Sequence, residues 1–490
     1  MPADVRIRKH KIAVQASDER MAVRCRQIIA ELATRELATL YERIFNQQEE
    51  NSTSYLNIGK LQIDLGTMTE KEMEMNFINA LEAQIRNVLE ELLAQSPVPD
   101  DTPAHSAKHQ DPDVERTTPV TYKSESQQNI EILQHYLEQG HYPWWITPEK
   151  STSAEALYRR LSDQGREELL LFMIRKFKNW TEARRNAAIK RLLASVNGVS
   201  EVEAVKTIEQ LSGLFSDSTL ERNVDTVIAN YAYFAEVFGI KPRIIHERLL
   251  YTILSAETQG EILKYFVESL FKDHKVVNQQ ALESLVNHRN SLLSGLAFST
   301  RTNDADETPK AHTSKQDGSK NTNQPEIYIN NAGLIILHPF LAPFFNLLGL
   351  TNEHHAFQRS EDKPFAAVLL HYLQTGETAY EEREMSLNKV LCGMDTSDAI
   401  DHDICIPAPA LQASRSLLEE LIGHWTALKG SSVESVQHSF FTRPGKLSFN
   451  GNAWLLQVER TAMDVLVDRL PWGLSVIKLP WNKQLIYTEW

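Results

Sequence analysis

Two long polar stretches constrain the fold of this chain more than any other feature of its sequence. Residues 96–126 and 301–325 are rich in Pro, Asp, Thr and Ser and contain almost no large apolar side chains. Such segments bury too little apolar surface to offset the entropy lost on ordering, so we expect both to be flexible linkers. They divide the 490 residues into three predicted domains, 1–95, 127–300 and 326–490.

The first domain has the pattern of a small α+β unit. Apolar residues alternate in His10–Gln15 and in Asn57–Leu65, which predicts two strands. A helical pattern follows each strand, and Ser17 and Thr69 can provide the N-caps. A unit of this size cannot cover both faces of a sheet, so we expect it to pair with another copy or another chain. The two helices are predicted over residues 17–48 and 70–94.

The middle domain is predicted to be helical throughout. Its apolar stripes at helical spacing are interrupted by Gly198, Gly213, Gly239 and Gly260. These breaks predict helices of roughly 12–25 residues packed as a stacked array. There is no strict sequence period and no sustained heptad, so neither a named repeat family nor one long coiled coil is indicated.

Two similar phrases end in glycine, one before the middle helices and one in the third domain. They are His135–Gly140, HYLEQG, and His371–Gly376, HYLQTG. Each has the pattern of a helix that ends in a left-handed glycine cap.

The third domain combines helical patterns with an aromatic, Pro-rich end. Its segment Leu334–Leu350 is the nearest approach to a membrane span, but it falls slightly short of about 18 apolar residues. It is interrupted by His338, Pro339, Pro343 and Asn346. We expect this segment to be buried or covered by a partner, and we predict no stable membrane anchor. The predicted fold class is mainly α, with a small α+β N-terminal domain, a helical middle array and an aromatic-rich, mostly helical C-terminal domain.

Charge and cysteine content argue against several classes of protein. The 51 Lys and Arg against 65 Asp and Glu give a net charge of −14, which disfavours nucleic acid or an anionic membrane as the main partner. The three cysteines, Cys25, Cys392 and Cys405, are far apart and form no disulfide framework or Cys-rich zinc module. The first residues show no apolar core of a secretion signal, so we expect synthesis in a reducing cytoplasm.

The sequence contains no recognisable catalytic constellation. The motifs GxxxxGK[ST], HExxH and GxSxG are absent, as is GxGxxG after a strand. Asp401, His402 and Cys405 could gather around zinc, but neighbouring residues rarely point at one ion, and a polar loop is the simpler interpretation. The acidic run Glu381–Glu384 is interpreted as a solvated helix face. We therefore predict no enzyme activity, no catalytic residue, no metal and no cofactor.

Clusters of Trp, Phe and Pro are the most unusual feature of the composition. Indole rings favour packed corners and protein interfaces, and a preceding proline fixes the backbone. These considerations allow two interpretations of the clusters, as part of a domain core or as a contact surface for other proteins. The interaction candidates are Pro143, Trp144, Trp145, Asn331, Gly333, His338, Pro339, Phe340, Pro471, Trp472, Pro480 and Trp481.

Several of these strings together resemble the tape measure proteins of contractile injection systems, phage-tail-like particles that include the extracellular antifeeding-prophage type. Ile329–Leu341, INNAGLIILHPFL, is similar to that family's NAGLVLLHPFL signature. Further similar strings occur in the family's order, at Leu61–Gly66, Gly140–Trp145, Leu370–Glu377, Lys389–Met394, His424–Lys429, Phe441–Arg443, Leu470–Gly473 and Leu479–Trp481. The resemblance covers the first 95 or so residues, Ile130–Trp145 and nearly all of Glu326–Trp490.

The resemblance implies a structural assembly component that occupies the inner tube of the particle and sets its length. It implies the inner tube, baseplate or spike and tail-cap proteins as partners, and self-association in several copies. It also implies a cytoplasmic location during assembly and a place inside the tube afterwards. A single helix over 127–300 would reach roughly 260 Å, but the Gly and Pro breaks favour compact domains over one rod.

Two alternative functions remain open at this stage. A cytoplasmic helical adaptor or chaperone for tube or toxin subunits also fits the acidic charge and the aromatic surfaces. A metal-dependent hydrolase would depend on Asp401, His402 and Cys405 and is the least favoured hypothesis.

Overall fold

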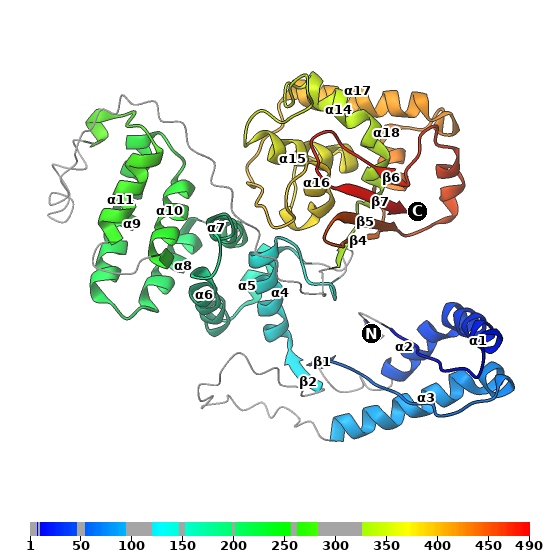
Figure 1. Ribbon diagram of the computed structural model, residues 1–490. Helices are drawn as coiled ribbons and strands as arrows, with labels where there is room; N and C mark the ends of the chain where they lie inside the picture. The colour runs from blue at the N-terminus through cyan, green and yellow to red at the C-terminus, as the bar shows by residue number, and fades with distance from the viewer. Residues whose placement is uncertain are drawn as a thin grey trace. The chain divides into compact units, whose positions relative to one another are not determined.

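The computed structural model describes residues 7, 10–46, 54–94, 120–146, 152–197, 201–255, 262–282 and 326–490. Helices dominate these residues, and their strands form two small sheets (Figure 1). The prediction of a mainly α fold is confirmed. The chain divides into two compact units, residues 1–129 and residues 130–490.

The smaller unit is built around three helices with a narrow apolar core. Its elements are α1 (Glu19–Leu32), the π-helical turn η1 (Ala33–Leu37), α2 (Ala38–Asn46), β1 (Ser54–Ile58), α3 (Glu70–Ala94) and β2 (Val120–Ser124). The predicted cap of α3 is confirmed, because Glu72 N donates to Thr69 Oγ1 and Thr69 N donates to Glu72 Oε2. The core residues repeat at helical spacing and include Ile28, Leu40, Ile44, Phe77, Leu81, Ile85 and Leu89.

The strands of the smaller unit differ from the prediction. His10–Gln15 forms no strand, and β1 ends at Ile58, so the rest of Asn57–Leu65 is not a strand either. β1 instead pairs antiparallel with Val120–Ser124, the described end of the predicted first linker. The remainder of that linker and the whole of the second lie outside the described residues. Apolar alternation in one segment does not indicate which distant segment supplies its ladder of hydrogen bonds.

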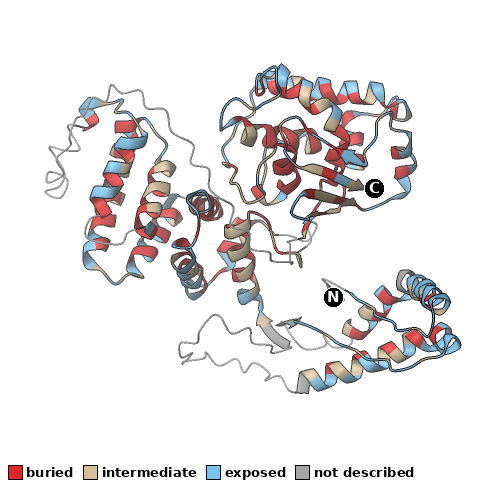
Figure 2. Cartoon of the chain, viewed as in Figure 1, coloured by how far each residue is buried: buried red, intermediate tan, exposed pale blue. Residues whose placement is uncertain are grey.

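The first half of the larger unit is the predicted array of helices. Its helices are α4 (Glu125–Gln139), α5 (Ala154–Arg160), α6 (Asp163–Phe177), α7 (Glu182–Asn197), α8 (Glu201–Gly213), α9 (Ser218–Phe238), α10 (Pro242–Ser255) and α11 (Ile262–Asp273). Local signals set their ends: the Asp217 side chain caps α9, left-handed Gly239 terminates it, and Pro242 starts α10. Buried residues line the inner faces of these helices (Figure 2), among them Phe177, Leu193, Val224, Phe234, Leu249 and Phe266.

The second half of the larger unit, residues 326–490, mixes short helices with a sheet. Its helical elements are η4 (Ala332–Leu337), α14 (His338–Leu347), α15 (Asp362–Thr375), η5 (Glu382–Glu384), α16 (Ser386–Leu391), α17 (Ala408–His424), η6 (Thr426–Leu428), α18 (Val433–Val436), η7 (Gln437–Phe441), η8 (Ala462–Val465) and η9 (Val467–Arg469). Its strands are β3 (Ile327–Ile329), β4 (Gly445–Phe449), β5 (Ala453–Val458), β6 (Val476–Ile477) and β7 (Leu485–Glu489).

These five strands form one sheet in the order β3-β4-β5-β7-β6, in which only β5 and β7 run parallel. One face contributes Leu447, Leu456, Ile477 and Ile486 to the core. The sequence did not predict this sheet. Its strands have two to six residues each, and β3 pairs with a strand more than a hundred positions away, so periodicity carried little signal.

The expectation that Leu334–Leu350 is buried or covered by a partner is confirmed for only part of the segment, because Pro339, Pro343 and Leu347 are exposed. The segment forms η4 and α14, and Leu334, Ile336 and Phe345 are fully buried. Among the described residues, no helix is long and apolar enough to cross a membrane.

Candidate functional site

The glycine phrase before the middle helices marks a crowded point of the larger unit. Gly140 ends α4 with φ +79°, and Gly376 ends α15 with φ +77°, so both left-handed caps are confirmed. A Cβ atom at Gly140 would lie 2.5 Å from Arg191 Nη2 and 2.9 Å from Glu382 Oε1. Glycine is required here both by its φ and by the close approach of these side chains.

Arg191, Glu382 and Lys389 form a buried ion cluster between the helical array and residues 326–490. Arg191 of α7 donates from Nη2 to Glu382 Oε1 at 2.8 Å, and Lys389 Nζ of α16 donates to the same oxygen at 2.7 Å. Their side chains are 0%, 7% and 1% exposed. The cluster therefore holds the two halves of the larger unit together with charges that water does not screen.

Backbone carbonyls accept further hydrogen bonds from both cations. Arg191 donates from Nη1 to Leu137 O at 3.0 Å and from Nη2 to Ser397 O at 2.6 Å, and Lys389 Nζ donates to Thr396 O at 3.0 Å. Burial favours the neutral carboxyl, but the charges and hydrogen bonds of Lys389 and Arg191 outweigh it and hold the pKa of Glu382 below its ordinary value. Glu382 thus stays ionised between two cations.

The interpretation of Glu381–Glu384 as a solvated helix face is wrong for Glu382, which is 8% exposed. The sequence analysis also missed Arg191 and Lys389. An arginine among several in a basic helix carries no signal of burial, because its partner lies 191 positions further along the chain. Near the cluster, the feature that the sequence did show was the glycine cap at Gly140, and it gave no indication of buried charges.

The Asp401–Asp403 loop lies against basic residues of the helical array. Lys190 Nζ is 2.7 Å from Asp401 Oδ1, Lys241 is paired with Asp403, and Arg243 contacts the His402 ring. Burial and the charge of Arg243 lower the pKa of His402. Within the described ranges, no group of three or more His, Cys, Asp or Glu side chains could hold a metal ion. Asp401, the carboxylate of the hydrolase hypothesis, is thus paired with Lys190.

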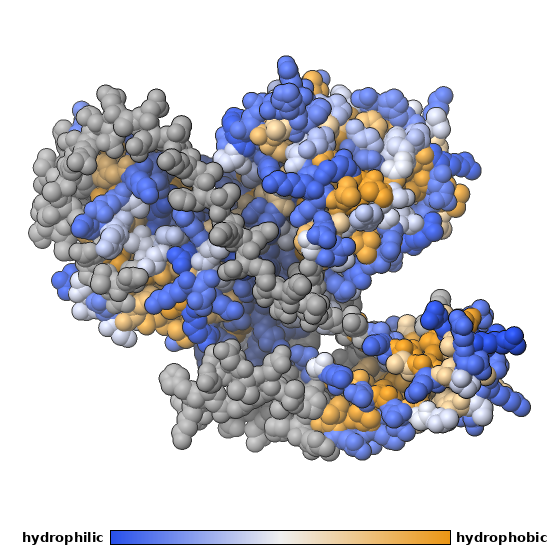
Figure 3. Space-filling view, viewed as in Figure 1, coloured by the Kyte–Doolittle hydropathy of each residue, from blue (hydrophilic) through white to orange (hydrophobic). Residues whose placement is uncertain are grey.

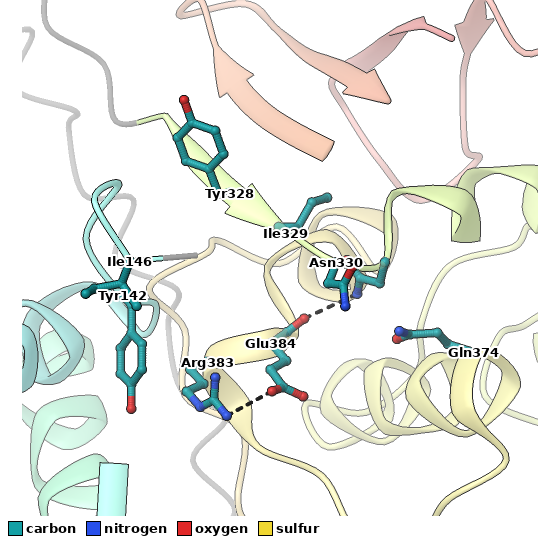
Figure 4. Close-up of a pocket in the computed structure, with 9 residues that line it drawn as sticks. Tyr142, Ile146, Tyr328, Ile329, Asn330, Gln374, Arg383 and Glu384 are labelled. Carbon is teal, nitrogen blue, oxygen red and sulfur yellow. Dashed lines mark hydrogen bonds and ion pairs between the residues drawn. The ribbon is translucent and has the colours of Figure 1, made fainter. Parts of the chain in front are cut away.

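A pocket of about 90 Å³ lies beside the ion cluster (Figure 4). Its walls are Tyr142, Ile146, Tyr328, Ile329, Asn330, Asn331, Gln374, Arg383 and Glu384. Arg383 is paired with Glu384 at 2.9 Å, and its guanidinium carbon is 5.2 Å from the centre of the Tyr142 ring. The buried Oδ1 of Asn331 has no hydrogen-bond partner among the described residues. None of the lining residues is a serine, cysteine or histidine, so the pocket offers no nucleophile with an imidazole base.

The interaction candidates of the signature string are mostly embedded in the domain. Asn331 donates from Nδ2 to Asn388 Oδ1 at 2.7 Å, and His338 donates from Nδ1 to Ile335 O at 3.1 Å. A side chain at Gly333 would collide with the Phe440 carbonyl group. Pro339 is exposed and Phe340 is half-buried at the start of α14. Binding of a partner by these residues stays a prediction.

The Trp-Pro candidates are partly engaged within the domain as well. Trp472 Nε1 donates to Ile336 O at 3.1 Å, and Trp481 Nε1 donates to Leu391 O at 2.8 Å. Pro471 and Pro480, which precede these indoles, are exposed. In the loop after α4, Pro143 is buried, while Trp144 and Trp145 are half-buried and pack edge to face at 6.0 Å. The structure therefore gathers the candidates into several corners rather than one surface.

Two histidines near the ion cluster, buried His141 and half-buried His135, predict a pH-dependent stability. The His135 and His141 rings are 5.1 Å apart, and burial lowers the pKa of His135 to about 4 and that of His141 to about 3. The unfolded chain takes up these protons below about pH 6.5, whereas the folded chain does not. We therefore expect the free energy of unfolding to fall with decreasing pH, by about 1.4 kcal/mol per pH unit for each histidine.

This pH dependence can be measured by tryptophan fluorescence in denaturant at pH 7, 6 and 5. All 8 tryptophans lie in the larger unit, so the signal reports on that unit alone. His135→Phe should remove the contribution of one histidine to the pH dependence of the free energy of unfolding. His424→Phe, at the exposed end of α17, is the control and should leave this pH dependence unchanged. An unchanged slope in His135→Phe would contradict the prediction.

These features define a mainly helical structural protein with a mixed α/β C-terminal core. The chain matches the contractile injection system tape measure protein family over residues 3–490. It belongs to that family, so it is a structural component of a contractile injection particle, and other components of the particle are its partners. No curated protein and no solved structure matches the chain.

Proposed function

We propose that this chain occupies the inner tube of the particle and helps to set its length. The observation that carries the proposal is the family match, which covers residues 3–490 rather than one domain. The inner tube, the baseplate or spike and the tail cap are the proposed contacts. On this proposal, the protein is in the cytoplasm during assembly, acts in several copies and performs no catalysis.

The described helices limit how such a chain could measure length. The longest is α3 with 25 residues, which corresponds to about 38 Å at 1.5 Å per residue. The helices of the middle array pack around a common core, so their individual lengths do not sum to one long span along a single axis. We therefore assign the adjustable length to the parts of the predicted linkers that precede β2 and β3, residues 96–119 and 301–325, and treat the compact parts as fixed spacers.

Surface-exposed members of the candidate set are the proposed contacts with other particle components. Pro339, Pro471 and Pro480 are exposed, and Trp144 and Trp145 present part of their rings. Proline and indole together offer rigid apolar contact area at low entropic cost. Asn331 and Gly333, by contrast, would act by holding the domain in shape.

Lengthening the second predicted linker tests the proposal. Duplicating residues 301–325 should lengthen the tube by roughly 40 Å if the insert is helical and by roughly 80 Å if it is extended, as measured by electron microscopy of purified particles. The same insert in the turn between β4 and β5, after Asn450, is the matched control and should leave tube length unchanged. Equal lengths in wild type and linker variant would refute the ruler role.

The same preparations distinguish the alternative of a cytoplasmic adaptor or chaperone. Mass spectrometry should find the chain in purified particles at a fixed ratio to the tube subunit. A chain that remains wholly in the soluble fraction would favour the adaptor.

A further inference from the structure

One face of the five-stranded sheet is turned away from the apolar core of residues 326–490 and is partly exposed. The face that packs on the core carries the buried residues Leu447, Leu456, Ile477 and Ile486. Their neighbours in sequence point to the opposite face, because side chains alternate along a strand. We call this opposite face the outer face; its members are Tyr328, Lys446, Ser448, Leu455, Gln457, Val476, Leu485, Tyr487, Glu489 and Ala453, the last of which is buried.

The centre of the outer face is apolar. The register aligns Leu455 with Tyr487, and Tyr487 with Val476, so these three side chains form a row across β5, β7 and β6. Tyr487 is 42% and Val476 is 55% exposed, and Leu455 and Leu485 are half-buried. Figure 3 shows apolar surface over the region of β6 and β7, bordered by hydrophilic residues. Such a continuous apolar row is typical of an interface.

The charged rim of the outer face is arranged in a self-complementary way. Lys446 on β4 and Glu489 on β7 lie in one row, with Gln457 of β5 between them. A two-fold axis parallel to the strands and above β5 would exchange the positions of β4 and β7. It would therefore place Lys446 of each copy opposite Glu489 of the other copy, which gives two symmetry-related ion pairs. The same axis brings Leu455 of one copy against Leu455 of the other.

The present neighbours of the two charged groups leave both accessible. Lys446 Nζ is 3.5 Å from Glu326 Oε1, and Glu489 Oε2 accepts from Gln457 Nε2 at 2.6 Å. Each of these side chains therefore has one partner at the rim and retains further hydrogen-bonding capacity.

We propose that the outer face is a dimer interface in which a second copy of this chain packs sheet on sheet. Aligned sheets of this kind pack about 10 Å apart with interdigitating side chains. The inference depends on the register, exposure and charge of the sheet and is independent of any role in tube length.

Sedimentation of the full-length chain over a range of concentrations tests this interface. We expect a reversible monomer–dimer equilibrium, and Tyr487→Lys should raise the dissociation constant at least tenfold, because it buries an unpaired charge at the centre of the row. Leu347→Lys, on a residue 76% exposed on α14, is the matched control and should leave the constant unchanged. Near-wild-type tryptophan fluorescence will verify that each variant is folded. A chain that is monomeric throughout, or a dimer insensitive to Tyr487→Lys, would overturn the proposal.

Charge reversal tests the two-fold arrangement itself. Lys446→Glu and Glu489→Lys should each weaken the dimer, because each places like charges opposite one another in both symmetry-related pairs. The double variant restores opposite charges and should return the dissociation constant to within about threefold of wild type. A double variant weaker than either single variant would overturn the proposed axis.

Discussion

Glu382→Gln is expected to lower the free energy of unfolding of the larger unit by about 3–5 kcal/mol. The substitution removes the single carboxylate that lies between Arg191 and Lys389, so two cations remain buried and face each other. Glutamine is nearly isosteric with glutamate, and the loss therefore reports charge rather than packing. Denaturant unfolding followed by tryptophan fluorescence at pH 7 will measure it.

The neighbouring acid provides the control for this experiment. Glu381 pairs with Arg383 at 2.6 Å, but its side chain is 43% exposed. Glu381→Gln should cost at most about 1 kcal/mol, as is usual for surface ion pairs. Adding Lys389→Met to Glu382→Gln should recover part of the lost stability, because it removes one of the unpaired charges. If Glu382→Gln and Glu381→Gln lowered the free energy of unfolding equally, the conclusion that Glu382 is the carboxylate of a buried ion cluster would be contradicted.

Gly333→Ala is expected to cost about 3 kcal/mol or more, or to prevent residues 326–490 from folding. Gly333 lies in η4, where a Cβ atom would collide with the carbonyl oxygen of Phe440 and lie 2.9 Å from Cα of Phe441. The obstructing atoms belong to backbone, which cannot rotate away as a flexible side chain would. Thermal and denaturant unfolding of the full chain will measure the loss.

A second glycine separates this steric effect from the general effect of Gly→Ala. Gly423 lies in the last turn of α17, and a Cβ atom there would meet nothing within 4 Å. Gly423→Ala should stabilise the chain by about 0.5–1 kcal/mol through its helix propensity. The two variants should therefore shift stability in opposite directions. A destabilisation by Gly423→Ala equal to that by Gly333→Ala would refute the packing explanation.

Both predictions concern the sequence segments that resemble the family. The substituted residues either belong to such a segment or contact a residue of one. Lys389 begins one such string, Gly333 lies in another, and Gly140 packs against Arg191 and Glu382. The structure accordingly gives these residues an internal role: Lys389 and Gly140 lie where the two halves of the larger unit meet, and Gly333 permits close packing within residues 326–490. A rigid spacer inside a particle would need such a fixed arrangement, which is why we regard the ion cluster as relevant to assembly.

Local features of the sequence were sufficient to predict most of the helices. The capping box at Thr69, the glycines at 140, 239 and 376 and Pro242 act within a few residues of themselves, so their effect on the chain can be deduced without knowing the fold. The burial of residues 334–337 followed in the same way from their apolar composition. The family could be recognised because the matching strings occur together and in order.

The tertiary structure alone decided the sheets, the ion cluster and the outer face. β1 finds its partner in a segment predicted to be a linker, and β3 pairs with a strand more than a hundred residues later. Whether Glu382 is solvated or buried depends on Arg191 from another helix, and whether Tyr487 is exposed depends on which face of the sheet the helices cover. Such properties arise from contacts between residues far apart in the chain, and neither periodicity nor propensity encodes them, because both describe only how a residue behaves among its near neighbours.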